Sequence, residues 1–294
     1  MKKLLCFPLI LLLCAVLLPC SSAAAARIHN STERQKAAQM ARNGQRDPVV
    51  AQVLDIMQAE GELIVLTVDH ALLYNKKSKD LSIIEENAGL LDSMYYIDGE
   101  LYLNSLHYGE LYRQSADTEP YLHYHDPAWK AEKLLYTGES FVVWSRRKDT
   151  DAQQLVWYRD AKDTAAVAID GLQISECSAY REDSVLLFCA EGLYQVFSDG
   201  RRERISHGIG AEVPEKLLDI CSPHYDIDKD RLYYLRGDYA NVLNKDFTEQ
   251  RLAKMRLGLS PSEYRGIVAK PLENAYVTPI NKEGALALKF VNIK

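Results

Sequence analysis

The residues with the clearest potential for chemistry lie in the stretch CSPHYDIDKDRLYYLRG, residues 221–237. Asp226, Asp228 and Asp230 occupy alternate positions in it, as the first oxygen ligands of a calcium loop do. If Asp226 is position 1, the template requires glycine at position 6 and a bidentate glutamate at position 12. The chain has arginine and glycine at those two places. The stretch therefore predicts a hairpin turn, in which aspartate side chains accept hydrogen bonds from nearby backbone amides, and not a cation site.

A second candidate is YLHYHDPAW, residues 121–129. The alternation of a strand would place His123 and His125 on one face with Asp126 beside them, and two imidazoles at that spacing can share a metal ion. Exposed polar positions on an outer strand give the same pattern, and we expect that alternative. No third ligand can be assigned among the other histidines of the region that follows the amino-terminal segments: His70, His107, His207 and His224.

Local motifs for nucleophilic or nucleotide chemistry are absent. The sequence contains no Gly-x-Ser-x-Gly, no phosphate-binding loop and no His-Glu-x-x-His. Ser206–His207 and Ser222 near His224 are pairs without a recognisable orienting acid. An active site can still be assembled from several repeats, so a hydrolase or lyase, metal-dependent through His123 and His125, stays open as the alternative.

The amino terminus has the pattern of a secretory signal peptide. Two lysines precede an apolar run from Leu4 to Leu18, and small residues follow from Ser21 to Ala26. The run is shorter than the roughly 20 residues of a membrane-spanning helix, and its end offers Ala-x-Ala sites to a signal peptidase. We expect residues 1–26 to be cleaved, leaving a secreted, periplasmic or cell-surface protein. An uncleaved anchor and lipidation of Cys20 stay open.

The charge of the chain excludes some partners. The formal charge is −6, and it becomes −8 without residues 1–26, which contain two lysines and no other charged residue. Such a chain has no electrostatic basis for binding nucleic acid or an anionic membrane, and it favours a neutral or basic ligand over a polyanion. Membrane association is expected only if the signal segment is retained or Cys20 is lipidated.

Three cysteines follow the signal segment: Cys177, Cys189 and Cys221. An odd number excludes a disulfide scaffold, and none of the spacings is Cys-x-x-Cys. Cys177 and Cys189 flank the predicted turn YREDS nearly symmetrically, so they could face each other across a hairpin. One disulfide is left open because cross-strand geometry often prevents bonding.

Helical patterns occupy the stretch between the signal and the repeats. STERQKAAQMARN, residues 31–43, has a capping box, and in RDPVVAQVLDIMQAEGE, residues 46–62, Asp47 and Pro48 stand where a helix begins. The apolar residues of the second stretch fall on one helical face: Val49, Val50, Val53, Leu54 and Met57. We therefore predict a helical amino-terminal segment over residues 27–62, which packs on the next domain as a lid or brace.

From Leu63 onward the sequence consists of short aromatic and β-branched runs separated by turn residues. Six segments superimpose when the central residues of their third predicted strands are aligned. These residues are 38, 45, 37, 48 and 46 positions apart: Tyr74, Tyr112, Trp157, Tyr194, Val242 and Leu288. A four-stranded unit that recurs at this spacing indicates a β-propeller, in which neighbouring sheets cover each other's faces. We expect residues 63–294 to form an all-β propeller of about six four-stranded blades; a β-sandwich is the alternative.

Three of the repeated stretches resemble known propeller families. SPHYDIDKDRLYYLRG, residues 222–237, is similar to the Ser-Pro-Asp-Gly-Lys-x-Leu-x-Phe repeat of TolB-type and related bacterial extracytoplasmic propellers. GELYRQSAD and GLYQVFSDG resemble the Leu-Tyr-x-x-x-x-x-Gly strand of YWTD-like propellers. The likeness extends from Leu63 to the carboxyl terminus. It implies a binding or scaffolding module.

Tyrosine is unusually frequent, with 18 residues against 6 phenylalanines. Most of these rings fall in predicted strands, where packing between blades is the expected role, and some could stack against a sugar or peptide.

From these features together we expect a noncatalytic, exported recognition module without a cofactor. It would bind a protein or glycan partner over one end of the propeller or in its central funnel.

Overall fold

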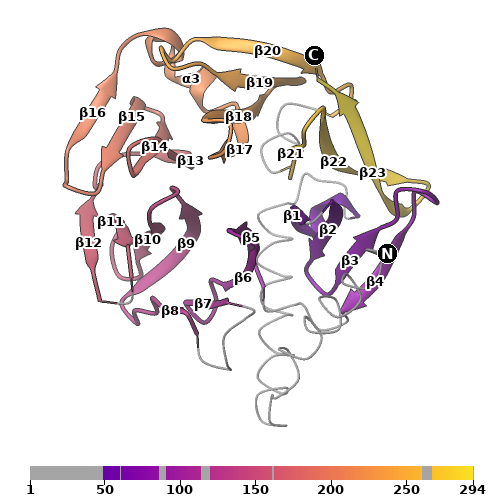
Figure 1. Ribbon diagram of the computed structural model, residues 1–294. Helices are drawn as coiled ribbons and strands as arrows, with labels where there is room; N and C mark the ends of the chain where they lie inside the picture. The colour runs from indigo at the N-terminus through magenta and orange to yellow at the C-terminus, as the bar shows by residue number, and fades with distance from the viewer. Residues whose placement is uncertain are drawn as a thin grey trace. The chain divides into compact units, whose positions relative to one another are not determined.

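The computed structural model describes residues 49–59, 61–85, 91–113, 120–160, 162–259 and 267–293. These residues form six antiparallel sheets that follow one another along the chain, five of four strands and one of three (Figure 1). Within each sheet the strands are neighbours in sequence order. The same described residues also contain three short helices: η1 (Val50–Gln52), η2 (Gly208–Ala211) and α3 (Pro214–Leu217).

The chain divides into two compact units, and the first comprises residues 1–123 and 279–288. It contains the first two sheets. The first sheet consists of β1 (Val53–Ala59), β2 (Glu62–Thr67), β3 (Ala71–Tyr74) and β4 (Leu81–Glu85). The second sheet consists of β5 (Ser93–Ile97), β6 (Glu100–Ser105), β7 (Glu110–Arg113) and β8 (Leu122–His123).

The second unit comprises residues 124–278 and 289–294, and it contains the next three sheets. The third sheet consists of β9 (Trp129–Tyr136), β10 (Phe141–Arg147), β11 (Gln153–Tyr158) and β12 (Thr164–Ala168). The fourth consists of β13 (Ile174–Tyr180), β14 (Ser184–Cys189), β15 (Gly192–Phe197) and β16 (Arg202–Ile205). The fifth consists of β17 (Ile220–Asp226), β18 (Arg231–Arg236), β19 (Tyr239–Leu243) and β20 (Glu249–Lys254). The sixth sheet, β21 (Lys270–Pro271), β22 (Ala275–Lys282) and β23 (Ala285–Asn292), contributes residues to both units.

The predicted repeat is confirmed at every aligned position. Tyr74, Tyr112, Trp157, Tyr194, Val242 and Leu288 each lie in the third strand of their sheet. Consecutive sheets pack through their first strands: β1 contacts β5 in the first unit, and β13 contacts both β9 and β17 in the second. Fourth strands such as β12 and β16 are largely exposed. This succession of antiparallel sheets is the blade repeat of an all-β, six-bladed propeller.

The predicted helix over residues 46–62 is wrong in the part that the structure describes. Only Val50–Gln52 forms a helical turn, and Val53–Ala59 is strand β1, which pairs with β2 across the turn at Gly61. Five of the seven β1 residues are buried, Asp55 among them, so both faces of the strand carry buried side chains. A short run of this kind cannot be distinguished from a helix by its periodicity. The repeat therefore begins at Val53 and not at Leu63, while residues 1–48 lie outside the described ranges.

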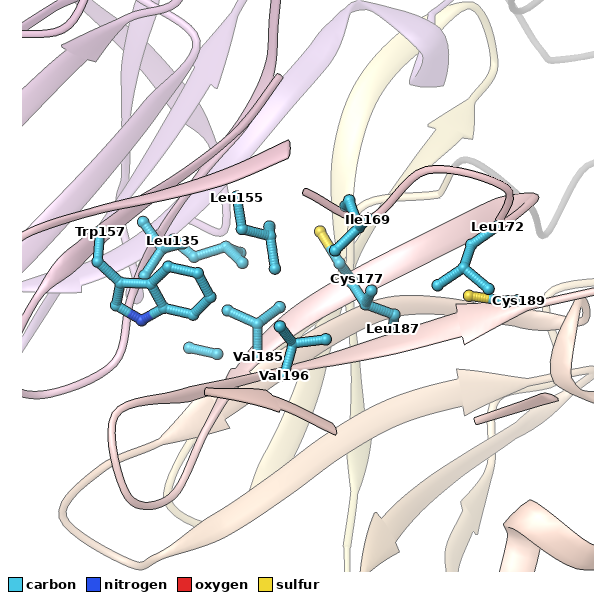
Figure 2. Packing of buried hydrophobic residues seen from close by; sticks show 12 residues of the cluster. Leu135, Leu155, Trp157, Ile169, Leu172, Cys177, Val185, Leu187, Cys189 and Val196 are labelled. Atoms are coloured by element: carbon cyan, nitrogen blue, oxygen red, sulfur yellow. The ribbon is translucent and has the colours of Figure 1, made fainter. Parts of the chain in front are cut away.

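Apolar side chains fill the space between the third and fourth sheets. Trp157, Leu155 and Leu187 are almost completely buried in this cluster (Figure 2). Each four-stranded sheet has too few residues to cover its own faces, so a neighbouring sheet supplies the other half of the core. Tyr233 and Tyr234 of β18 are also buried, which confirms packing as the role of those two rings.

Cys177 and Cys189 lie in this cluster as free thiols (Figure 2). Cys177 of β13 is opposite Leu187 in the strand register, whereas Cys189 is opposite Ile174. The two cysteines therefore do not face each other across the hairpin. Cys221, in β17, is buried and free as well.

Polar contacts between hairpin turns connect the sheets of the second unit. The carboxylate of Asp183, in the β13–β14 turn, accepts hydrogen bonds from Thr137 Oγ1 at 2.7 Å and Ser140 Oγ at 3.2 Å, both in the β9–β10 turn. The indole of Trp157 donates to the Asp183 carbonyl at 3.1 Å. Arg181, in the same turn as Asp183, donates to Asp230 of the β17–β18 turn at 2.5 Å. Three successive sheets are thereby connected at equivalent turns.

Replacing Asp183 with alanine should lower the free energy of unfolding by about 2–4 kcal/mol. The change removes a buried acceptor from two hydroxyls. It also places an alanine, whose side chain cannot form a local hydrogen bond, in left-handed backbone, since Asp183 has φ 50°. Asp183→Asn is the matched control, because asparagine tolerates this backbone and keeps one acceptor. Urea denaturation should show a smaller loss for asparagine than for alanine; equal losses would contradict the role given to the carboxylate.

The first unit contains a carboxyl group whose ionisation should affect stability. Asp92 Oδ2 accepts a hydrogen bond from the Leu106 amide at 2.7 Å. Burial raises the pKa of Asp92 to about 6, against the opposing effect of hydrogen bonds from the Leu106 and His107 amides. Because the folded-state pKa exceeds the usual 3.8, this group stabilises the fold most at low pH, and its contribution is lost as pH rises through 6.

Asp92→Asn should therefore change how stability depends on pH. The stability of the wild type relative to the variant should fall between pH 4 and pH 7, by at most about 3 kcal/mol. Urea unfolding at a series of pH values measures this difference. A difference that is constant over the range, or that grows with pH, would be incompatible with a raised pKa.

Candidate functional site

The aspartates of residues 226–230 lie in the turn between β17 and β18, as predicted. The Asp226 carboxylate accepts a hydrogen bond from the Lys229 amide at 3.0 Å and forms an ion pair with the Lys229 ammonium at 3.0 Å. Asp230 accepts from Arg181 and from the Tyr225 hydroxyl, and these bonds lower its pKa despite the effect of burial. Asp228 is exposed at the tip of the turn. Two of the three carboxylates are thus occupied by donors from the protein.

The histidines of residues 121–129 are both exposed, with the buried Tyr124 between them. Strand β8 ends at His123, whose Nε2 lies 3.5 Å from Glu110 Oε1. His125 follows the end of the strand, and Asp126 accepts a hydrogen bond from the Ala128 amide at 2.8 Å. In the described ranges, no three histidine, cysteine or carboxylate side chains are grouped so that they could hold a metal ion.

A different set of polar side chains lies on first strands in the second unit. We call it the first-strand cluster: Lys133 of β9, Glu176 of β13, His224 of β17 and Lys270 of β21. Each of these strands is at one edge of its own sheet, so one side of its backbone has no partner strand within that sheet. The sequence interpretation identified none of these residues as a binding candidate, except that it noted His224 beside Ser222.

Strand irregularities precede three members of the cluster. The ladder shifts between Ala131 and Lys133 in β9, between Ile174 and Glu176 in β13, and between Cys221 and His224 in β17. An irregularity of this kind bends a strand and changes the direction of the next side chains. The first strands of three successive sheets thus carry the same kind of irregularity.

One ion pair joins the third and fourth sheets within the cluster. Lys133 Nζ lies 2.5 Å from Glu176 Oε1 and donates to the Cys177 carbonyl at 2.9 Å. The two charged side chains are 31% and 24% exposed, so solvent reaches both. Lys133 is therefore held beside β13 and remains accessible.

A serine joins the fifth sheet to the strand that carries Lys270. Ser222 lies in the β17 irregularity with φ 48°. Its hydroxyl oxygen accepts from the Ala269 amide at 2.8 Å, and the hydroxyl lies 2.8 Å from the Ala269 carbonyl, to which it donates. Ala269 directly precedes Lys270. The serine that stood beside a histidine in sequence thus tethers β17 to the residue that precedes β21.

The surroundings of His224 disfavour its protonation. The side chain is opposite Tyr233 in the β17–β18 register, and the Tyr233 ring contacts that of Tyr276 with centroids 6.2 Å apart. Burial holds the pKa of His224 well below its usual range, and the charges of Lys270, Lys133 and Lys229 lower that pKa further. The imidazole is therefore neutral at pH 7.

The buried thiols offer no alternative nucleophile. Burial raises the pKa of Cys177 to about 12 and that of Cys189 further still. Neither is a thiolate at neutral pH, and the thiolate is the reactive form. The lysines and the neutral imidazole of the first-strand cluster can form hydrogen bonds, and the lysines add positive charge.

Comparison with protein families and with curated proteins finds no match. Among solved structures, a streptogramin B lyase is 8% identical, with 83% of this chain and 94% of that chain covered and a TM-score of 0.48. The β-propeller domain of Cps50 (Swd1) from Myceliophteria thermophila is 10% identical, with coverage of 83% and 85% and a TM-score of 0.47. The extracellular domain of a putative one-component system from B. thetaiotaomicron is 14% identical, with coverage of 81% and 38% and a TM-score of 0.39.

These likenesses assign the chain to no family. The resemblance to TolB-type and YWTD-like repeats is supported for the propeller fold, and no family match supports either of those families in particular. Within the described ranges, no helix has the length and apolar character that crossing a bilayer requires.

Replacing His224 with glutamine should reduce the sensitivity of the fold to acid. Because the folded-state pKa of His224 is below the usual 6.5, the unfolded chain binds a proton first as pH falls. The contribution of the neutral imidazole to stability is thus complete above pH 6.5 and is lost below it. The stability of the wild type relative to the variant should decline from pH 7 to pH 5 in urea titrations. If the difference instead increased toward low pH, His224 would be stabilised as the cation.

Proposed function

We propose that this protein is an exported, noncatalytic recognition module that binds a protein or glycan partner with the first strands of its second unit. The observation that carries the proposal is the first-strand cluster, in which Lys133 of the third sheet pairs with Glu176 of the fourth, and Ser222 and His224 of the fifth stand beside the tether to Ala269 and Lys270. A surface built from several sheets can recognise a wide partner with residues far apart in sequence. The rigid sheets behind it keep the ordering cost of binding low.

The composition of the cluster supports binding over catalysis. The cluster consists of a lysine paired with a glutamate, a neutral, half-buried histidine and a second lysine. These groups provide donors and charge, but no nucleophile with an adjacent base and orienting acid. The serine nearest to the histidine is engaged by Ala269. Export rests on the signal pattern of residues 1–26, and cleavage near Ala24 to Ala26 is part of the proposal.

A capture experiment with a matched pair of variants tests this function. Protein without residues 1–26 is immobilised and exposed to culture medium, to envelope extract and to a glycan array, beside a hydrolase and lyase activity panel. We expect saturable binding without turnover. Lys133→Met with Lys270→Met should weaken it at least tenfold, whereas Lys162→Met, an exposed lysine outside the cluster, should leave it unchanged.

Two results would count against the proposal. One is turnover that co-purifies with the protein and requires no stable partner, which would establish an enzyme. The other is capture that the double variant retains in full, which would place the binding surface elsewhere. Amino-terminal sequencing of the exported protein tests the cleavage site in the same preparation.

A further inference from the structure

The last strand of the third sheet is an edge strand without charged side chains. β12 has the sequence TAAVA and pairs with β11 on one side, and no strand of the described ranges pairs with its other side (Figure 1). Its five residues keep a regular register with β11, without a bulge. An edge of this kind presents unpaired amide and carbonyl groups to any other extended strand.

The hydrogen bonds to β11 determine which backbone groups face the free edge. The Ile169 amide donates to the Gln153 carbonyl at 2.9 Å, and the Arg159 amide donates to the Asp163 carbonyl at 3.1 Å. Successive residues of an antiparallel strand bond alternately to the two sides, so the odd-numbered residues from 163 to 169 bond to β11. The even-numbered residues direct their N–H and C=O groups outward: Thr164, Ala166 and Ala168.

The last strands of the other sheets have features that oppose edge pairing. Within the described ranges, β8 has two residues, and the pairing of β4 with β3 is irregular. β16 and β20 are rich in charged side chains, and β23 contains Lys289. Short length, bulges and charged side chains are the means by which proteins prevent edge strands from associating. β12 has none of these protections.

We propose that β12 pairs with β12 of a second copy of this chain, in an antiparallel register centred on Ala166. In this register the two Ala166 residues are opposite each other, and Thr164 of each copy is opposite Ala168 of the other. Each facing pair exchanges two hydrogen bonds, so every outward N–H and C=O group obtains a partner. The two third sheets then form one continuous sheet. This inference does not depend on the proposed recognition function.

The side chains favour a second copy as the partner. Threonine, alanine and valine face one another in this register, and no like charges are opposed. Beyond the strand, the exposed Lys162 of each copy lies opposite the exposed Asp170 of the other. A surface ion pair adds little affinity, but it favours antiparallel over parallel pairing, in which equal charges would face each other. Self-pairing of β16 about Glu203 would instead oppose its two neighbouring arginines.

Sedimentation velocity of the purified protein over a dilution series tests the pairing, and we expect a monomer–dimer equilibrium. Ala166→Lys and Ala166→Glu each place like charges opposite each other at the centre of the register and should weaken self-association at least tenfold. An equimolar mixture of these two variants should restore it, which also shows that both variants fold. Gln250→Lys adds the same charge as Ala166→Lys at an exposed position of β20 and should have no effect.

Amide hydrogen exchange measured by NMR provides a second readout at single residues. The amides of Ala165 and Val167 bond to β11, so they should exchange slowly in monomer and dimer alike. The amides of Thr164, Ala166 and Ala168 should become protected only at concentrations at which the dimer is present, because the second copy supplies their acceptors.

Several results would overturn the proposal. One is a protein that stays monomeric at every concentration, and another is a dimer that Ala166→Lys and Ala166→Glu leave intact. A mixture of these variants that does not associate would exclude the register centred on Ala166. If the protein stays monomeric while a different protein protects the three outward amides, the edge binds that protein and pairing with a second copy is wrong.

Discussion

The carboxylate of Asp183 is the contact on which the arrangement of the second unit depends most directly. It is only 7% exposed, and it binds two hydroxyls from the preceding sheet while its own backbone carbonyl accepts from Trp157. A buried charge is tolerated only when donors surround it, so the two sheets can satisfy this group in one relative position. Apolar packing between the sheets is not directional in this way, and it would permit sliding.

That positional constraint extends to the first strands. Arg181 continues the connection from the Asp183 turn to Asp230 of the fifth sheet, and Ser222 continues it from the fifth sheet to Ala269. Each contact fixes one sheet relative to the next at one end of the first strand. The strands that carry the first-strand cluster are thereby held next to one another.

The parts of the fold that were predictable are those encoded by local pattern. The six third strands were aligned correctly from single residues such as Trp157 and Val242, because strand alternation and turn residues recur in every unit. The segment around Val53 was misassigned because burial on both faces erases alternation. The first-strand cluster had no local signal: Ser222 binds a residue 47 positions away, and Lys133 binds one 43 positions away.

The net charge of the chain does not describe the charge around any one group. At an ionic strength of about 0.15 M, charges farther than roughly 8 Å apart are screened, so a net value averages over groups that a ligand never senses together. The charges of Lys270, Lys133 and Lys229 lower the pKa of the His224 imidazole although the chain as a whole is acidic, because the fold brings lysines from separate sheets within electrostatic range of it.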